Sequence, residues 1–175
     1  LSGGQAQRVA IARAIAVDPA IIICDEAISS LDVLIQAQVV NLLEKLRKDL
    51  KLACLFIAHD LATVKQVSDR VGVMHLGQLA ELGAAEKLYT RPRHPYTKAL
   101  LNSIPGLDPE TGQARRPVPL EGDPPSPVNP PSGCRFRTRC PIAQDICAEV
   151  MPELESADED HRVACHFPNG VGDNA

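Results

Sequence analysis

The chain has 175 residues, of which 45% are hydrophobic and 23% charged, and its formal net charge is -4. This composition is typical of a soluble globular protein and excludes collagen-like, coiled-coil and disordered classes. The negative charge without a long Lys/Arg run argues against nucleic acid as a partner, and no apolar run approaches the roughly 20 residues that cross a bilayer.

The first predicted elements are a helix and a strand. Ser2 and Gln5 form the pattern of a capping box, which predicts a helix from there to about Val17. Residues 21–24 are wholly apolar, which predicts a central strand buried on both faces. Two acids, Asp25 and Glu26, follow at its carboxyl end.

The next elements continue the alternation of helix and strand, so we assign residues 1–104 to the α/β class. Apolar residues at helical spacing predict a second helix over 35–50, and residues 53–58 predict a second buried strand that ends at His59. The remaining predicted elements are a short helix at 61–67, a hairpin of residues 71–76 and 78–82 around Gly77, a helix around Glu86 and a helix at 96–103.

The composition changes after residue 104. A proline-rich stretch follows, and we expect it to be extended, because proline lacks an amide donor and fixes its own backbone angle. The predicted organisation is a partial nucleotide-binding domain at 1–104, a linker at 105–132, a cysteine-rich module at 133–168 and a tail at 169–175.

Glycines and a hydroxyl stand at the start of the first predicted helix, in the segment Leu1-Ser2-Gly3-Gly4-Gln5. Bare amides at the positive end of a helix dipole can bind an anion, although the segment taken alone indicates only a cap and a turn. Together with the acids that follow, it resembles the signature motif of ATP-binding cassette (ABC) ATPases. In that family two cassettes pair head to tail, so the resemblance implies that Ser2, Gly3, Gly4 and Gln5 contact the ATP of a partner cassette.

Residues 21–26 resemble the Walker B strand of the same family. The resemblance implies that Asp25 holds Mg²⁺ through water and that Glu26 polarises the water that attacks ATP. The chemistry needs both acids, because a hard cation prefers oxygen ligands and an in-line attack needs a proton acceptor opposite the leaving group.

Two further segments match the family at the expected distances. Residues 29–32, which end at Asp32, resemble the D-loop that communicates between cassettes, although Ala27 and Ile28 stand where Pro and Thr are common. His59 matches the switch histidine that contacts the γ-phosphate. A lone histidine at a strand end is usually structural, but its order and spacing relative to the two acids favour the catalytic role.

The sequence contains no G-x-x-x-x-G-K-[ST] loop, which would supply most of the donors to the phosphates. Because the chain also begins at Leu1, we interpret it as the C-terminal portion of a P-loop ATPase domain whose N-terminal part is missing. We expect this chain alone to be inactive in ATP hydrolysis.

A second resemblance concerns the branch of the family. His94-Pro95-Tyr96-Thr97, with the leucines after it, resembles the segment that follows the cassette in ATPases of oligopeptide and dipeptide importers. This implies a second ATPase subunit and transmembrane permease subunits as partners, and an extracytoplasmic peptide-binding protein as an indirect one. The resemblance also implies that the protein lies in the cytoplasm, bound peripherally to the cytoplasmic face of the cell membrane.

Four cysteines lie in the C-terminal section, namely Cys134, Cys140, Cys147 and Cys165. Four thiolates can hold zinc or an iron–sulfur cluster, and either would add folding energy that the few apolar residues there cannot. The closely spaced C-x-x-C pairs of zinc ribbons are absent from this section. Some importer ATPases carry a four-iron cluster in this tail, so the resemblance implies a [4Fe-4S] cluster, while Zn²⁺, two disulfides and four reduced thiols remain open.

The sequence leaves two other functions open. A chromosome-maintenance or repair ATPase shares the signature and the D-loop, but it has no comparable tail. In a non-enzymatic protein, the cysteine module would be a redox or docking element on a cassette scaffold. The other two cysteines, Cys24 and Cys54, fall inside predicted strands, and we expect them to be core residues.

Overall fold

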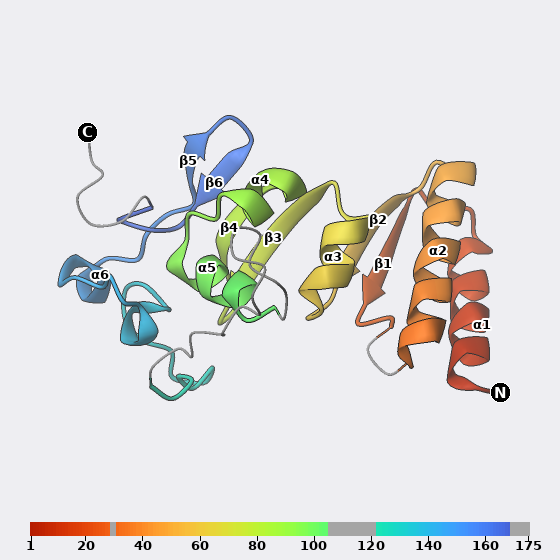
Figure 1. Cartoon of the computed structure of the whole chain (residues 1–175), viewed down its shortest axis with the longest axis horizontal. Helices are drawn as coiled ribbons and strands as arrows, with labels where there is room; N and C mark the ends of the chain where they lie inside the picture. The colour runs from red at the N-terminus through yellow and green to blue at the C-terminus, as the bar shows by residue number, and fades with distance from the viewer. Residues whose placement is uncertain (29–30, 105–121, 169–175) are drawn as a thin grey trace, which may run out of the picture. The chain divides into compact units, whose positions relative to one another are not determined.

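The computed structural model describes residues 1–28, 31–104 and 122–168 (Figure 1). The chain divides into two compact units, Leu1–Ser68 (unit 1) and Asp69–Ala175 (unit 2). This division falls earlier than the predicted boundary at residue 104, so the second unit contains the predicted hairpin together with the cysteine-rich section. Most of the predicted linker and the tail after residue 168 lie outside the described residues. The described helices include none that is long and apolar enough to span a membrane.

Unit 1 begins with α1 (Gly3–Ile15), and the predicted capping box is confirmed. The Gln5 N–H donates to the Ser2 hydroxyl oxygen at 3.3 Å, and the Ser2 N–H donates to the Gln5 side chain at 2.9 Å. These two bonds satisfy amides that a helix start would otherwise leave without partners. The helix ends at Ile15, slightly before the predicted end at Val17.

The second helix, α2 (Val33–Asp49), packs against α1. It begins earlier than predicted, because the Asp32 carboxylate accepts the Ile35 N–H at 3.0 Å and so caps the helix start. A cluster of apolar residues joins the two helices. Its fully buried members are Ile11, Ile28, Val39 and Val40, and Leu31, Ile35, Leu42 and Leu43 pack around them.

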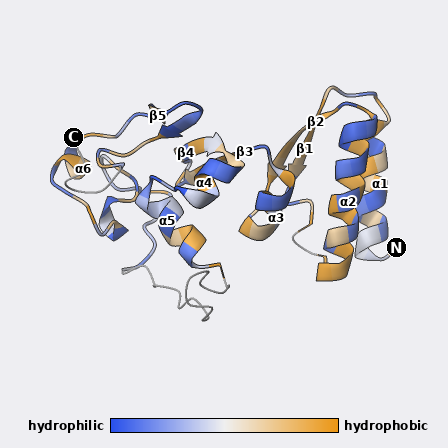
Figure 2. Ribbon diagram, turned by 45° about the horizontal axis from the view of Figure 1, so that its top comes forward, coloured by the Kyte–Doolittle hydropathy of each residue, from blue (hydrophilic) through white to orange (hydrophobic). Residues whose placement is uncertain are grey.

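Two parallel strands, β1 (Ile21–Asp25) and β2 (Ala53–Ile57), precede the short helix α3 (Leu61–Val67). Figure 2 shows the two strands as mostly hydrophobic. The prediction that β1 is buried on both faces is wrong for this structure, because Ile21 and Ile23 are 62% and 64% exposed. The opposite face of β1 is covered by side chains from α1 and α2, among them Ile15 and Leu43.

Unit 2 is built on a sheet with strand order β3-β4-β6-β5. The predicted hairpin around Gly77 is confirmed as β3 (Arg70–His75) and β4 (Gln78–Ala84), and it is followed by α4 (Ala85–Thr90) and α5 (Pro95–Asn102). Two strands near the C-terminus, which the sequence pattern does not predict, extend this sheet. The C-terminal elements are η1 (Arg137–Arg139), α6 (Ile146–Glu149), β5 (Glu155–Asp158) and β6 (His161–Val163).

A buried polar group connects the hairpin to β6 and α5. Glu81 on β4 is fully buried, and its carboxylate lies 2.7 Å from the His161 ring nitrogen Nε2. The same carboxylate accepts the backbone N–H groups of Arg93 at 2.7 Å and His94 at 3.0 Å. Buried charges persist where such partners satisfy them, so this group holds three separate segments together.

His94 makes unit 2 sensitive to acid. Its side chain is 3% exposed, its Nδ1 accepts the Tyr96 N–H at 3.0 Å, and burial lowers the pKa of His94 from 6.5 to about 4 despite the attraction of Glu81. Between pH 4 and 6.5 the unfolded chain therefore binds a proton at His94 more readily than the folded chain does. The stability that neutral His94 contributes is fully present above pH 6.5 and is lost as the pH falls towards 4. We expect unit 2 to lose about 3 kcal/mol across this window.

Urea unfolding followed by circular dichroism at several pH values measures this loss. The variant His94→Asn keeps a side chain that can cap α5 but has no imidazole, so we expect a shallower pH dependence. A ring proton of His94 that titrates near pH 6.5 in the folded protein would contradict the prediction.

Candidate functional site

Three of the predicted site residues gather where the parallel strands end. Asp25 is the last residue of β1 and pairs in register with Ile57 on β2. Glu26 follows Asp25, and His59 lies two residues beyond Ile57. Because the carboxyl ends of parallel strands meet at one sheet edge, the three residues lie along the same edge of this strand pair.

Glu26 and His59 lie close together and face solvent. The distance between His59 Nδ1 and Glu26 Oε1 is 3.6 Å, and the two side chains are 72% and 58% exposed respectively. Glu26 has a φ of 45°, a left-handed conformation that is uncommon for a side chain other than glycine, and its N–H donates to the Ile57 carbonyl at 2.9 Å. Such backbone conformations cluster at functional sites. The two groups can therefore act on one molecule bound at this edge.

Asp60 holds the chain immediately after His59. Its carboxylate caps α3 by accepting hydrogen bonds from the backbone N–H groups of Ala62 and Thr63. It also accepts a hydrogen bond from the Thr63 hydroxyl. The bond from Thr63 is the main reason why the pKa of Asp60 is lowered from its ordinary value. Asp60 therefore fixes the start of α3 directly after His59, and the D-x-x-T pattern of residues 60–63 is the sequence signal for this cap.

Gln36 is a residue of this region that the sequence analysis missed. Its side-chain amide on α2 donates to the carbonyls of Ile28 and Leu31, both at 3.0 Å. It thus connects α2 to both ends of the chain segment that follows Glu26. Ser29 and Ser30 of the predicted D-loop lie outside the described residues, and the described Asp32 acts as the cap of α2.

The signature residues lie at the start of α1, with the Ser2 hydroxyl and the Gln5 amide engaged in the capping box. The two glycines pack against the region around α2. A Cβ added to Gly4 would lie 2.6 Å from Ile35 Cγ2, and one added to Gly3 would lie 3.1 Å from Leu31 Cδ2. Gly4 therefore has a packing requirement of its own, apart from any role with a nucleotide.

We expect Gly4→Ala to lower the free energy of unfolding by about 1–2 kcal/mol, because the Ile35 methyl sits on a stiff β-branched side chain. Gly3→Ala is the matched control. Its neighbour is the flexible end of Leu31, and alanine gains up to about 1 kcal/mol in helix propensity, so we expect Gly3→Ala to be neutral or stabilising. Urea unfolding of both variants tests this, and equal effects at the two positions would disprove the packing argument.

The four C-terminal cysteines come near one another in unit 2. The thiols of Cys134, Cys140 and Cys147 each interact electrostatically with the thiol of Cys165, and burial raises the pKa of Cys165 to about 11. The pKa values of Cys134 and Cys140 are also raised, again mainly by burial. All six cysteines of the chain are free thiols, so the two-disulfide alternative is not observed.

The predicted metal centre is not confirmed. Across residues 1–28, 31–104 and 122–168, no group of three or more His, Cys, Asp or Glu side chains is arranged to hold a metal ion. Backbone N–H groups do point at the sulfurs: Phe167 N–H donates to Cys165 at 3.4 Å, and Cys134 and Cys140 accept similar bonds from Phe136 and Ile142. These bonds act to lower the thiol pKa values, but burial outweighs them, so the pKa values of Cys134, Cys140 and Cys165 remain raised.

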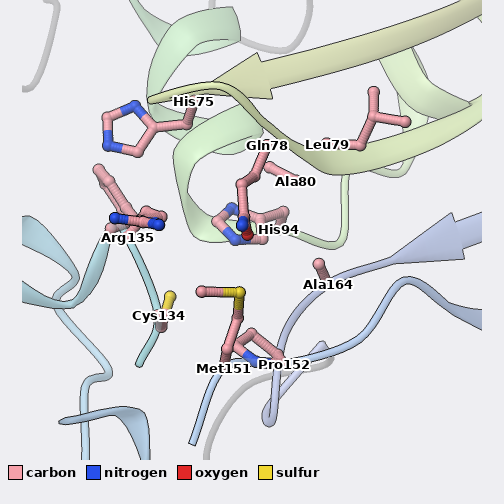
Figure 3. A pocket seen from close by; sticks show the side chains of 11 residues that line it. His75, Gln78, Leu79, Ala80, His94, Cys134, Arg135, Met151, Pro152 and Ala164 are labelled. Atoms are coloured by element: carbon pink, nitrogen blue, oxygen red, sulfur yellow. The ribbon is translucent and has the colours of Figure 1, made fainter. Parts of the chain in front are cut away.

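A small pocket adjoins Cys134 (Figure 3). It is lined by His75 of the hairpin, by His94 at the start of α5, and by Arg135 and Met151. Two buried nitrogens here, His75 Nε2 and Arg135 Nε, have no hydrogen-bond partner among the residues that the structure places. The residues that line the pocket all belong to unit 2, whereas Asp25, Glu26 and His59 belong to unit 1.

Two family models match the chain. Residues 80–147 match the C-terminal region of oligopeptide/dipeptide transporters, and residues 1–29 match ABC transporters. The first range includes the His94-Pro95-Tyr96-Thr97 segment and three of the four C-terminal cysteines. The second includes the signature residues with Asp25 and Glu26.

Several curated proteins are similar to the chain over almost its whole length. The oligopeptide transport ATP-binding protein OppF of Salmonella typhimurium is 56% identical over 164 residues, which are 94% of this chain and 49% of that protein. AppF of Bacillus subtilis, also an oligopeptide transport ATP-binding protein, is 53% identical over 166 residues, or 95% of this chain and 50% of that protein. The chain thus spans about half the length of the curated relatives it matches. The matches do not support a chromosome-maintenance ATPase or a non-enzymatic protein.

Proposed function

Since this chain belongs to the ATP-binding protein family of oligopeptide and dipeptide ABC transporters, we propose that it forms part of an ATPase that drives peptide import. The observation that carries the proposal is the distance of 3.6 Å between Glu26 and His59 at the carboxyl ends of two parallel strands. In an α/β sheet this edge is where ligands bind.

Each residue of this edge has a proposed role in the hydrolysis of MgATP. Asp25 holds Mg²⁺ through water, which suits a hard cation that prefers oxygen ligands and keeps part of its hydration shell. Glu26 orients the attacking water and accepts its proton. His59 donates a hydrogen bond to the γ-phosphate, and its neighbour Glu26 keeps the ring directed to the reacting group.

The proposed partner contacts follow from the other end of unit 1. Ser2, Gly3, Gly4 and Gln5 at the start of α1 contact ATP bound by a second ABC subunit, where the helix dipole favours phosphate. Asp32 belongs to the segment that meets that subunit. We place the pair on the cytoplasmic face of the cell membrane, against permease subunits that receive peptide from an extracytoplasmic binding protein.

Reconstitution tests this function. The intact gene product, its companion ATPase and the permease subunits are placed in lipid vesicles, and uptake of a labelled oligopeptide is followed with ATP and with a non-hydrolysable analogue. We expect uptake only with ATP. ATP hydrolysis that stays independent of peptide and drives no uptake would contradict peptide import, while an absence of hydrolysis would contradict the ATPase itself.

We also propose that Cys134, Cys140, Cys147 and Cys165 hold an iron–sulfur cluster of the four-iron type. The mutual proximity of these thiols and the N–H bonds to their sulfurs support it, since a cluster is larger than a single ion and hydrogen bonds to sulfur stabilise its ligands. Anaerobically purified protein should contain iron and acid-labile sulfide and absorb at about 400 nm. A colourless protein that contains only zinc, or no metal, would refute this.

A further inference from the structure

Two thiols meet inside unit 1, next to the candidate active site. Cys24 on β1 and Cys54 on β2 lie with their sulfur atoms 3.7 Å apart. In the parallel register Cys54 pairs with Ile22, two residues before Cys24, so both cysteines project from the same face of the strand pair. The prediction that both are core residues is confirmed for Cys24, which is buried, and is wrong for Cys54, which is exposed.

The two cysteines differ in their access to solvent. Cys24 is 5% exposed and belongs to the apolar cluster with Ile22 and Leu52, whereas Cys54 is exposed. Burial, together with the neighbouring Cys54, raises the pKa of Cys24 to about 12. A small oxidant in solution therefore meets Cys54 first, and Cys24 is held as a thiol directly behind it.

We propose that Cys24 and Cys54 form a modification site that a peroxide converts reversibly into a disulfide. The peroxide oxidises Cys54 to a sulfenic acid and is itself reduced to water. The Cys24 sulfur then attacks the Cys54 sulfur, the S–O bond breaks, and hydroxide leaves as water with the Cys24 proton. Two thiols and one hydrogen peroxide thus give one disulfide and two waters, and a dithiol reductant reverses the change.

The Cys24–Cys54 disulfide would displace residues of the candidate active site, because Cys24 directly precedes Asp25 and Glu26. A disulfide has sulfurs about 2.05 Å apart, so they must approach by about 1.7 Å from their present separation. That movement pulls the end of β1 against β2, which carries the chain to His59. A misplacement of about 1 Å in a catalytic group can cost about 10²-fold in rate.

Peptide mapping of the intact gene product tests the site directly. Trypsin releases Cys24 on the peptide of residues 14–45 and Cys54 on the peptide of residues 52–65, and neither contains another cysteine. After brief hydrogen peroxide treatment we expect these two peptides to be joined in a non-reducing digest and to separate on reduction. Both cysteines still reduced after oxidation, or Cys54 joined to another cysteine, would overturn the proposal.

Two variants check the order of events. In Cys24→Ala the exposed Cys54 should accumulate as a sulfenic acid that dimedone traps, and in Cys54→Ser the buried Cys24 should stay reduced. Labelling of Cys24 before Cys54 would overturn the assigned order. The wild-type mapping needs neither variant, so a variant that fails to fold does not remove the test.

The effect on turnover rests on the proposed ATPase function. We expect peroxide to lower the ATP turnover of the wild-type protein about 10²-fold and a reductant to restore it, while Cys54→Ser keeps its rate under the same treatment. The four C-terminal cysteines are present in both proteins, so they do not account for a difference. If peroxide lowered the turnover of the wild-type protein and of Cys54→Ser equally, the disulfide would not control turnover. If the two peptides were joined in a protein that has no ATPase activity, the disulfide would stand and only the proposed ATPase function would be refuted.

Discussion

Replacement of Glu26 by glutamine is expected to lower the ATP turnover of the intact gene product about 10³-fold. Glutamine has the shape of glutamate and can still reach His59, from which Glu26 lies 3.6 Å away. Its amide cannot accept the proton of the attacking water, and a positioned general base contributes about 10²–10⁴-fold to a rate. ATP binding should persist, because Glu26 is proposed to act on water and not on the phosphates.

Phosphate release in the steady state measures the turnover of Glu26→Gln, and retention of labelled nucleotide on a filter measures its binding. Glu44→Gln is the matched control, since Glu44 also lies in unit 1 and pairs along its own helix with Arg47 at 3.4 Å and Lys48 at 3.5 Å. We expect this control to change the rate by less than about twofold, as ion pairs three and four residues apart on one helix contribute only about 0.2–0.5 kcal/mol each. If Glu26→Gln hydrolysed ATP at the wild-type rate, Glu26 could not be the base.

The largest effect on stability is expected for Glu81→Ala. The fully buried Glu81 carboxylate is the acceptor for the N–H groups of Arg93 and His94 and contacts His161, itself only 1% exposed. Removal of one partner from a buried charged group leaves the others without compensation, which typically costs about 3–5 kcal/mol. We expect a loss of this size in the free energy of unfolding of unit 2.

Urea unfolding gives the size of the loss, and amide hydrogen exchange at Arg93 and His94 shows where it occurs. Glu81→Gln should lose less, since its carbonyl oxygen still accepts a hydrogen bond. Glu86→Ala is the control at an exposed position of the same unit, where we expect a change within about 0.5 kcal/mol. A Glu81→Ala protein with wild-type protection of both amides would show that the buried group does not hold these segments.

Local patterns in the sequence were sufficient for most of unit 1. The capping box of Ser2 and Gln5 places the start of α1 because both partners lie within one helical turn. Apolar spacing likewise predicts α2, and turn chemistry at Gly77 predicts the hairpin of unit 2. The prediction of a β1 buried on both faces was wrong, since an apolar run does not tell which of its faces a neighbour covers.

These local patterns do not predict contacts between residues that are far apart in the sequence. Strands β5 and β6 are short and mostly polar, so they carry no strong periodicity. Strand β6 pairs with the edge of β4, and β5 pairs in turn with β6. The partners of Glu81 lie 12, 13 and 80 residues away. Gln36 was missed for a similar reason, as no motif indicates that an amide on α2 holds the segment after Glu26.

The sequence by itself was sufficient to recognise the class of the protein and to propose Asp25, Glu26 and His59 as site residues, because the order and spacing of motifs can be read without coordinates. Only the tertiary structure decided that Glu26 and His59 lie within 3.6 Å of each other, that the C-terminal strands complete the hairpin sheet and that two cysteines on neighbouring strands face each other. Strand register and side-chain burial set these distances, and both depend on how remote segments pack.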